Sequence, residues 1–254
     1  MVNIFFEIHS SLPREGPGDN ASTRKAYLML PDLPEKPRIL DVGCGPGMQT
    51  IELARLSNGR IDALDNHQPF LDHLKKKAEE EDVSDRINII NGDMFALNYE
   101  DKSFDLIWSE GAIYIIGFEK GIREWRKLLT DKGYVVVSEL SWLRPDPPEE
   151  VRKFFAEGYP GIKTINENLE TIKKAGYRIT NHFVLPDESW WNNYYIPIAA
   201  KIPSLRLKYR DDEEALAILD CEELEMEMFH KYSKYYGYVS VSYTHLRAHE
   251  TGRN

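Results

Sequence analysis

The chain of 254 residues is poor in cysteine, in clustered basic residues and in long apolar runs. Its two cysteines, Cys44 and Cys221, do not suggest a disulfide framework or a zinc site, so we predict a reducing compartment and no metal. The formal net charge is −10 without a long basic run, which argues against nucleic acid or an anionic membrane surface as partner. We find no secretory signal and no long apolar span, and we predict a cytoplasmic protein outside the membrane.

What the chain does contain is an alternation of short apolar runs and helical patterns. A hydrophobic content of 42% with 29% charged residues is typical of a globular protein. The alternation is typical of a parallel sheet with crossover helices. Strands are predicted at residues 39–41, 60–64, 87–90, 104–108, 134–140 and 177–185, with a last one beginning near Tyr236.

The most informative stretch runs from Ile39 to Gly47 and places Gly43, Gly45 and Gly47 at alternate positions after an apolar strand. A helical pattern follows at once. Strand, glycine turn and helix together hold a nucleoside ligand in open α/β sheets, because glycine lets the backbone adopt strained turns and approach the ligand. The dinucleotide fingerprint is G-x-G-x-x-G, and Met48 stands here where its third glycine would be.

Three aspartates follow three successive strands: Asp41, Asp65 and Asp93. Ligands of open α/β sheets bind beyond the carboxyl ends of the strands. Asp65 lies about twenty residues beyond the glycines, the spacing of a carboxylate that accepts from ribose hydroxyls. We predict that Asp93 accepts from the exocyclic amine of adenine while Met94 packs on the ring. Asp41 is predicted to orient the turn and to attract the ammonium group of the ligand.

With these residues in place, the region from Arg38 to Leu140 resembles the cofactor-binding half of class I S-adenosylmethionine-dependent methyltransferases. The body from Pro13 to Val239 is similar to a family of bacterial small-molecule methyltransferases, mostly without assigned substrates. The matching stretches are Gly16–Asp19, Leu64–Leu71, Ser109–Tyr114, Leu185-Pro186 with Trp191 and Tyr195, and Tyr235–Tyr238. The resemblance implies an S-adenosylmethionine site that includes Gly43, Gly45, Asp65, Asn66, Asp93, Met94 and Glu110, with Gly18 on an amino-terminal segment that folds over it.

Alternation and resemblance together predict an α/β fold: a Rossmann-like, mostly parallel seven-stranded sheet with helices on both faces and a helical cap before the last strand. We predict one domain over residues 1–243, with a lid at 1–30, the cofactor-binding core at 38–140 and the cap at 186–235. Residues 1–20 read as irregular, and Asp19 or Asn20 is expected to cap a helix through Leu30. In the cap, helical spacing joins Ala217, Cys221, Leu224, Met228 and Tyr232.

The end of the chain fits this fold poorly. The fold requires an edge strand there, but residues 243–250 show no strand alternation. We predict that residues 244–254 form a non-native or disordered tail.

The expected reaction is an in-line displacement at the methyl of a sulfonium, in which the protein mainly positions the acceptor and excludes water. An acceptor that loses a proton also requires a base. Candidate bases are Glu110, Tyr114, Glu139, His182 and Tyr195, and none stands out. Ser109-Glu110-Gly111-Ala112 stands where methyltransferases of exocyclic or amide nitrogens often carry an Asn/Asp-Pro-Pro-aromatic motif, which disfavours that chemistry.

Tyr114 and an aromatic block formed by Trp190, Trp191, Tyr194 and Tyr195 are predicted to form an acceptor pocket, with the alternative that the block packs the cap onto the sheet. The predicted function is methyl transfer to a small molecule. One alternative is a catalytically silent S-adenosylmethionine-binding sensor or partner subunit. A nicotinamide-dependent oxidoreductase is disfavoured by the glycine spacing. The acceptor, the methylated atom and the oligomeric state are left open.

Overall fold

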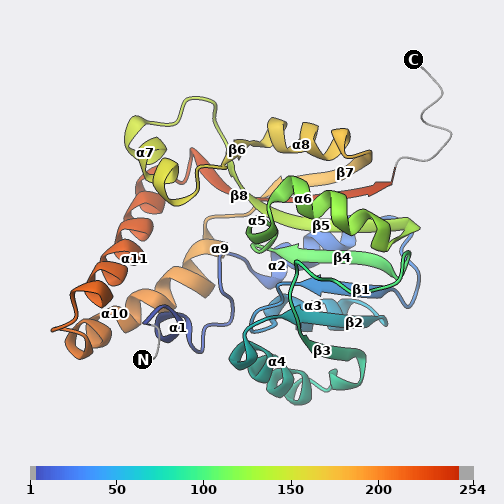
Figure 1. Cartoon of the computed structure of the whole chain (residues 1–254), viewed down its shortest axis with the longest axis horizontal. Coiled ribbons are helices and arrows are strands. Elements are labelled where there is room, and N and C mark those ends of the chain that lie inside the picture. The colour runs from blue at the N-terminus through green and yellow to red at the C-terminus, as the bar shows by residue number, and fades with distance from the viewer. Residues whose placement is uncertain (1–3, 246–254) are drawn as a thin grey trace.

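The computed structural model describes residues 4–245, and a sheet of eight strands forms its centre (Figure 1). The strands are β1 Arg38–Val42, β2 Arg60–Asp65, β3 Ile87–Asn91, β4 Phe104–Glu110, β5 Leu129–Trp142, β6 Lys163–Thr164, β7 Tyr177–Val184 and β8 Tyr236–His245. The strand order is β3-β2-β1-β4-β5-β8-β7, and the short β6 pairs with β5. Pairing is parallel from β3 to β5, whereas β8 is antiparallel to both β5 and β7. The mostly parallel α/β fold predicted from the sequence is confirmed.

Helices connect most of the strands. They are α1 Ile4–His9, α2 Asn20–Leu28, α3 Met48–Leu56, α4 Gln68–Glu80, α5 Ile113–Ile116, α6 Phe118–Glu124, α7 Glu149–Gly158, α8 Ile165–Lys174, α9 Glu188–Trp190, α10 Ile196–Lys208 and α11 Glu213–Tyr232, with short 3₁₀ turns η1 Ser84–Arg86 and η2 Trp125–Leu128 and a π-helical turn η3 Trp191–Tyr195. Asp19 caps α2 as predicted, because its carboxylate accepts from the backbone N–H of Ser22 at 2.6 Å. The prediction that residues 1–20 are irregular missed α1, which contributes Ile4 and Ile8, one turn apart, to the cap.

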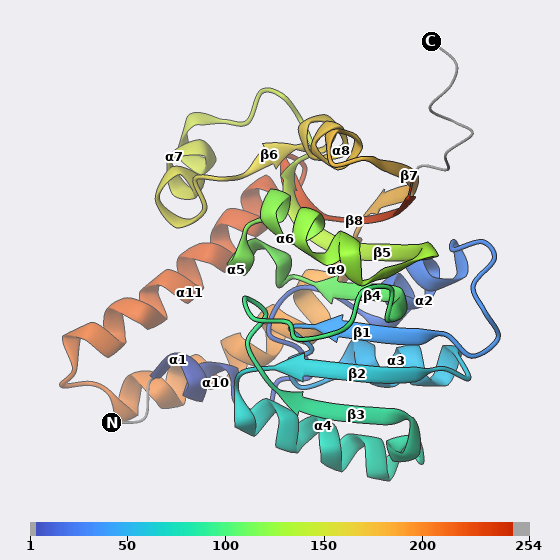
Figure 2. The same cartoon turned by 45° about the vertical axis from the view of Figure 1, so that its right-hand side comes forward.

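The sheet is covered on both faces (Figure 2). On one side, α2, α3 and α4 bury apolar residues against strand residues such as Ile39 and Ile61. On the other side, α5, α6 and α8 pack against the alternate strand residues, such as Leu40. Two faces are used because successive side chains of a strand point in opposite directions.

A third apolar cluster builds the cap beside the carboxyl end of the sheet. Helices α10 and α11 extend from the sheet as a pair, and α1 lies against α10 (Figures 1 and 2). The cluster also includes Val151 and Phe155 of α7. The cap is therefore assembled from three separate parts of the sequence. Within residues 4–245, no helix is both long and apolar enough to cross a membrane.

The last strand corrects the predicted start of the tail. Strand β8 continues through Thr244 and His245, and Thr244 pairs with Tyr134 of β5 and Arg178 of β7. It lies inside the sheet rather than at its edge. Because β8 is buried along nearly all of its length, its sequence lacks the alternation expected of an edge strand. Residues 246–254 of the predicted tail lie outside the described residues.

We therefore expect a chain that ends at Tyr243 to melt at least about 4 °C below a chain that ends at His245. The shorter chain loses the ladder contacts of two residues and the hydrogen bond from Thr244 Oγ1 to the Gly133 carbonyl at 2.7 Å. Each hydrogen bond contributes about 1 kcal/mol, and each kcal/mol shifts the melting temperature of a chain of this size by about 2–4 °C. Equal melting temperatures in calorimetry would show that the fold ends before Thr244.

Candidate functional site

The turn between β1 and α3 depends on glycine. Gly43 and Gly47 have φ angles of +74° and +89°, in the left-handed region that favours glycine. A Cβ on Gly43 would overlap the Ala112 methyl, and one on Gly47 would overlap the Leu74 side chain. The turn therefore packs closely against the loop after β4 and against α4.

A cavity of about 280 Å³ opens beside this turn, at the carboxyl ends of β1, β2 and β4. Most of the residues predicted to bind the cofactor line it: Gly43, Gly45, Asp65, Asn66, Asp93, Met94 and Glu110. Tyr114, predicted for the acceptor pocket, lines it as well. The cavity lies where the strand order reverses between β1 and β4, the usual place for a ligand in an open α/β sheet.

Asp65 joins the end of β2 to the glycine turn. Its Oδ2 accepts from the Gly45 N–H at 2.9 Å, and its Oδ1 accepts from the His67 N–H at 2.9 Å. A carboxylate offers about four acceptor sites, so capacity for ligand hydroxyls remains. Asp93 is anchored similarly, because its Oδ1 accepts from the Phe95 N–H at 2.9 Å.

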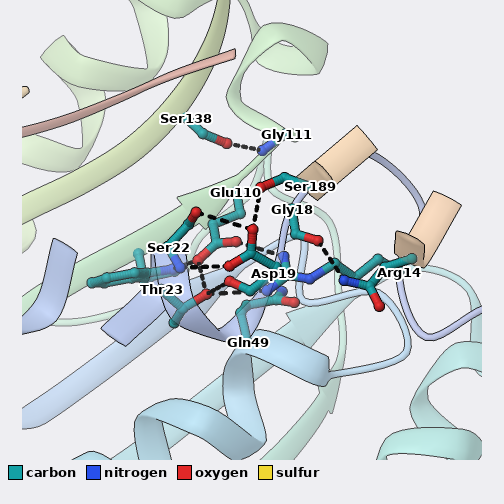
Figure 3. A network of polar contacts seen from close by, with 12 residues as sticks. Arg14, Gly18, Asp19, Ser22, Thr23, Gln49, Glu110, Gly111, Ser138 and Ser189 are labelled. Carbon is teal, nitrogen blue, oxygen red and sulfur yellow. Dashed lines mark hydrogen bonds and ion pairs between the residues drawn. The ribbon is translucent and has the colours of Figure 1, made fainter. Parts of the chain in front are cut away.

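Glu110 is held by three donors at the end of β4 (Figure 3). Arg14 Nη1 lies 2.5 Å from its Oε2, while Thr23 Oγ1 and Trp108 Nε1 donate to its Oε1 at 2.7 Å and 2.8 Å. The Arg14 and Glu110 side chains are 4% and 9% exposed, so the ion pair is buried. A carboxylate with three donors is a poor general base, and Glu110 is better suited to anchoring the amino-terminal segment.

This anchoring predicts a clear stability effect. Arg14→Met should reduce the free energy of unfolding by about 3–5 kcal/mol, because removing one partner leaves a buried charge unpaired. Chemical denaturation of this variant and of Arg14→Met/Glu110→Gln would measure it. The double variant should recover part of the loss; an Arg14→Met protein as stable as the parent would show that the pair is unimportant.

The amino-terminal segment covers the cavity. Residues 14–17 line it together with Phe5 and Phe6 of α1, and the Phe6 ring stacks on His67 with centroids 4.1 Å apart. Gly18 does not line this cavity and instead joins the segment to the cap. Its N–H donates to the Ser189 carbonyl and its carbonyl accepts from Asn193 Nδ2, both at 3.0 Å.

Asp41 also lies away from the cavity. Its side chain is fully buried, and its Oδ2 accepts from Thr50 Oγ1 of α3 at 2.6 Å. Burial raises the pKa of Asp41 to about 7. The carboxyl therefore fastens α3 to β1, and it does not line the cavity in which it is predicted to attract the ammonium group of the ligand.

A second cavity of about 230 Å³ adjoins the first and shares Glu15, Gly16, Pro17, Gly111 and Tyr114 with it. Its remaining lining residues come from β5, β8, the end of α7 and the cap: Glu139, Leu140, Gly158, Tyr159, Trp190, Tyr194, Glu225 and Tyr238. Of the predicted acceptor pocket, Tyr114, Trp190 and Tyr194 line this cavity.

Trp191 and Tyr195 line neither cavity. Tyr195 is fully buried, and its hydroxyl donates to Glu225 Oε1 at 2.9 Å. Trp191 packs edge-on against Tyr195 with ring centroids 5.3 Å apart. The alternative interpretation of this block, packing of the cap, describes these two residues.

The candidate bases are separated by the fold. His182 is exposed on the edge strand β7, opposite Val241, and it lines neither cavity. Glu139 is buried in the second cavity, where the Tyr159 hydroxyl donates to its Oε1. Burial raises the pKa of Glu139 to about 7.

Several lining residues escaped sequence reasoning, above all Arg14, Tyr159 and Glu225. Glu225 had a detectable signal, because it lies four residues before Phe229 and seven before Tyr232, both buried on α11. An acidic residue within an apolar helical stripe is a candidate site residue, because acidic side chains are rarely buried without a partner. Arg14 and Tyr159 lie outside regular periodic patterns, and no local signal marked them.

Comparison with known proteins matches residues 39–133 to the methyltransferase domain family. The chain is 26% identical over 175 residues to a sterol 24-C-methyltransferase of Neurospora crassa, a match that covers 65% of this chain and 46% of the relative. The chain thus spans about half the length of the curated relatives it matches.

Solved structures match over nearly the whole chain. A SAM-dependent methyltransferase from Geobacter sulfurreducens, in complex with S-adenosyl-L-homocysteine, is 22% identical with a TM-score of 0.83, covering 97% of this chain and 99% of that one. A SAM-dependent methyltransferase from Thiobacillus denitrificans, in complex with the same molecule, is 21% identical with a TM-score of 0.82 and the same coverage. At these identities the similarity shows a shared fold, cap included.

Proposed function

Because the chain carries a class I S-adenosylmethionine-dependent methyltransferase domain, we propose that it transfers a methyl group from S-adenosylmethionine to a small-molecule acceptor. The observation that carries the proposal is the convergence of the glycine turn, Asp65, Asp93 and Met94 on one cavity. A second cavity adjoins it, as a reaction between two bound molecules requires.

The first cavity offers groups that suit each part of the cofactor. Asp65 would accept from the ribose hydroxyls, and Asp93 would accept from the adenine amine. Met94 supplies an apolar surface for the adenine ring. Near the turn, glycine lets the backbone come close to the amino-acid end of the ligand. When bound, S-adenosylmethionine supplies a methyl group already activated on a sulfonium.

The chain's own contribution is positioning and the exclusion of water. Residues 15–17 line both cavities, and their segment is fixed to the sheet by Arg14 and to the cap by Gly18. We propose that this segment is the lid. Closing it would hold the acceptor near the donor in a site without solvent, which favours displacement.

Incubation with methyl-labelled S-adenosylmethionine and a panel of metabolites tests the proposal. We expect label in a small molecule, and none with a variant that does not bind the cofactor. Binding of S-adenosylhomocysteine without labelling of any compound would favour the silent sensor instead. Glu139 in the second cavity argues against that alternative, since it provides a buried carboxylate where the acceptor would bind.

A further inference from the structure

The second cavity is lined by acids and aromatic rings. Glu15, Glu139 and Glu225 contribute carboxyl groups, and Tyr114, Tyr159, Trp190, Tyr194 and Tyr238 contribute rings. No lysine, arginine or histidine lines it among residues 4–245. An anionic acceptor would therefore meet like charges without a compensating cation.

One of the three acids already has its counterion. Glu15 Oε2 lies 3.2 Å from His9 Nδ1 of α1. Desolvation lowers the pKa of His9, but the nearby Glu15 and Glu222 carboxylates outweigh it and raise that pKa to about 9. His9 is therefore charged at neutral pH and matches the charge of Glu15.

Glu139 and Glu225 have no such partner. Within the described residues, neither forms an ion pair, and each accepts one tyrosine hydroxyl, Tyr159 for Glu139 and Tyr195 for Glu225. Glu139 is 3% exposed, and its Oε2 has no hydrogen-bond partner in residues 4–245. A buried carboxylate without a counterion is costly unless a ligand supplies the charge.

Tyr194 adds a further polar group to the cavity. It is 8% exposed and lines the cavity, and within the described part of the chain no hydrogen bond engages its hydroxyl. That hydroxyl can therefore donate to or accept from a polar ligand. The Trp190 and Tyr238 rings, with centroids 5.3 Å apart, also line the cavity, and aromatic rings attract cations.

We propose, on the premise of the methyltransferase function above, that this cavity binds a small organic amine as its ammonium ion. The two unpaired carboxylates and the aromatic rings hold the cation, and Glu139 accepts its proton before methylation at nitrogen.

The proton balance of the reaction follows from these positions. The ammonium N–H proton moves to the Glu139 carboxylate, which leaves a neutral amine with a free lone pair. That lone pair forms the new C–N bond while the donor's C–S bond breaks and its electron pair returns to sulfur. The positive charge ends on the N-methylammonium product. The raised pKa of Glu139, about 7 and caused by burial, suits proton acceptance near neutral pH.

This chemistry agrees with the sequence after β4. Exocyclic and amide nitrogens have delocalised lone pairs, and the motif often found with such substrates is absent there. An aliphatic amine requires only a base, since its lone pair is localised once the proton has left.

Calorimetric titration with choline and with its uncharged isostere 3,3-dimethylbutan-1-ol tests the site directly, because neither probe needs to react. With S-adenosylhomocysteine present, we expect choline to bind about tenfold or more tightly than the alcohol. Glu139→Gln should remove most of this preference for choline. Glu225→Gln removes the other unpaired carboxylate and should reduce the same preference. Glu227→Gln, which changes an exposed carboxylate on the same helix as Glu225, should keep it.

Equal affinities of the parent protein for the two probes, tighter binding of the alcohol, or no binding of choline would overturn the proposal. The same samples separate it from the broader function. Failure to bind S-adenosylhomocysteine would contradict the methyltransferase proposal itself. Binding of S-adenosylhomocysteine without a preference for choline would contradict only the amine site.

Discussion

Glu139→Gln is expected to lower kcat by about 10²–10⁴-fold while leaving S-adenosylhomocysteine affinity unchanged. Glutamine keeps the size of the side chain and an acceptor for the Tyr159 hydroxyl, but it cannot take a proton at neutral pH. The factor is the usual contribution of a positioned general base. Single-turnover methyl transfer to an accepted amine would measure it, with Glu227→Gln as the matched control.

The pH profile provides a further readout for Glu139. Burial raises the pKa of this carboxyl to about 7, although Tyr159 and Lys163 offset part of the shift. Tyr114 and Tyr238 also face this charge. Below about pH 7 the base is protonated, so kcat of the parent should fall about tenfold per pH unit. A Glu139→Gln variant with parental kcat and the same pH profile would exclude Glu139 as the base.

Asp65→Ala is expected to weaken S-adenosylhomocysteine binding about tenfold or more. The change removes the predicted acceptor for two ribose hydroxyls, and a hydrogen bond to a charged group contributes about 1.5–3 kcal/mol. It also releases the Gly45 and His67 N–H groups that Asp65 holds. Asp62→Ala is the matched control, because Asp62 lies on the same strand and lines neither cavity. Equal affinities for both variants would show that Asp65 only shapes the turn.

The cofactor cavity could be predicted because its signals are local. The ends of parallel strands meet at one edge, so Asp65, Asp93 and the glycine turn had to converge once the strands were recognised. Asp41 was misplaced because a carboxyl at a strand end can point either to the ligand or to the helix that follows. Thr50 of α3 donates a hydrogen bond to the Asp41 carboxyl, which therefore points to the helix.

The cap shows where sequence reasoning ends. Helical spacing joined Ala217, Cys221 and Leu224, but these residues are exposed. Met228 and Tyr232 of the predicted stripe are buried, and the other buried residues of α11 are Ala215, Leu219, Met226 and Phe229. Both stripes are largely apolar, and only packing against α1, α10 and the sheet selects between them. Glu225 lies on the side of α11 that packing buries. The sequence therefore did not predict that Glu225 would line the second cavity.

Only some residues of the aromatic block line the second cavity, and helical spacing could not predict which ones. Trp190 ends α9, and the π-helical turn Trp191–Tyr195 follows it. A π-turn changes the angular spacing of side chains relative to an α-helix, so a 3.6-residue period could not show which rings face the cavity. Trp190 and Tyr194 line the cavity, while Trp191 and Tyr195 pack the cap.

Calorimetric titration of the protein with S-adenosylhomocysteine and, separately, with NAD⁺ tests the central claim most directly. The glycine spacing, Asp65, Asp93 and Met94 predict saturable one-site binding of S-adenosylhomocysteine, weakened by Asp65→Ala, and no detectable binding of NAD⁺. Binding of NAD⁺ without binding of S-adenosylhomocysteine would contradict the account.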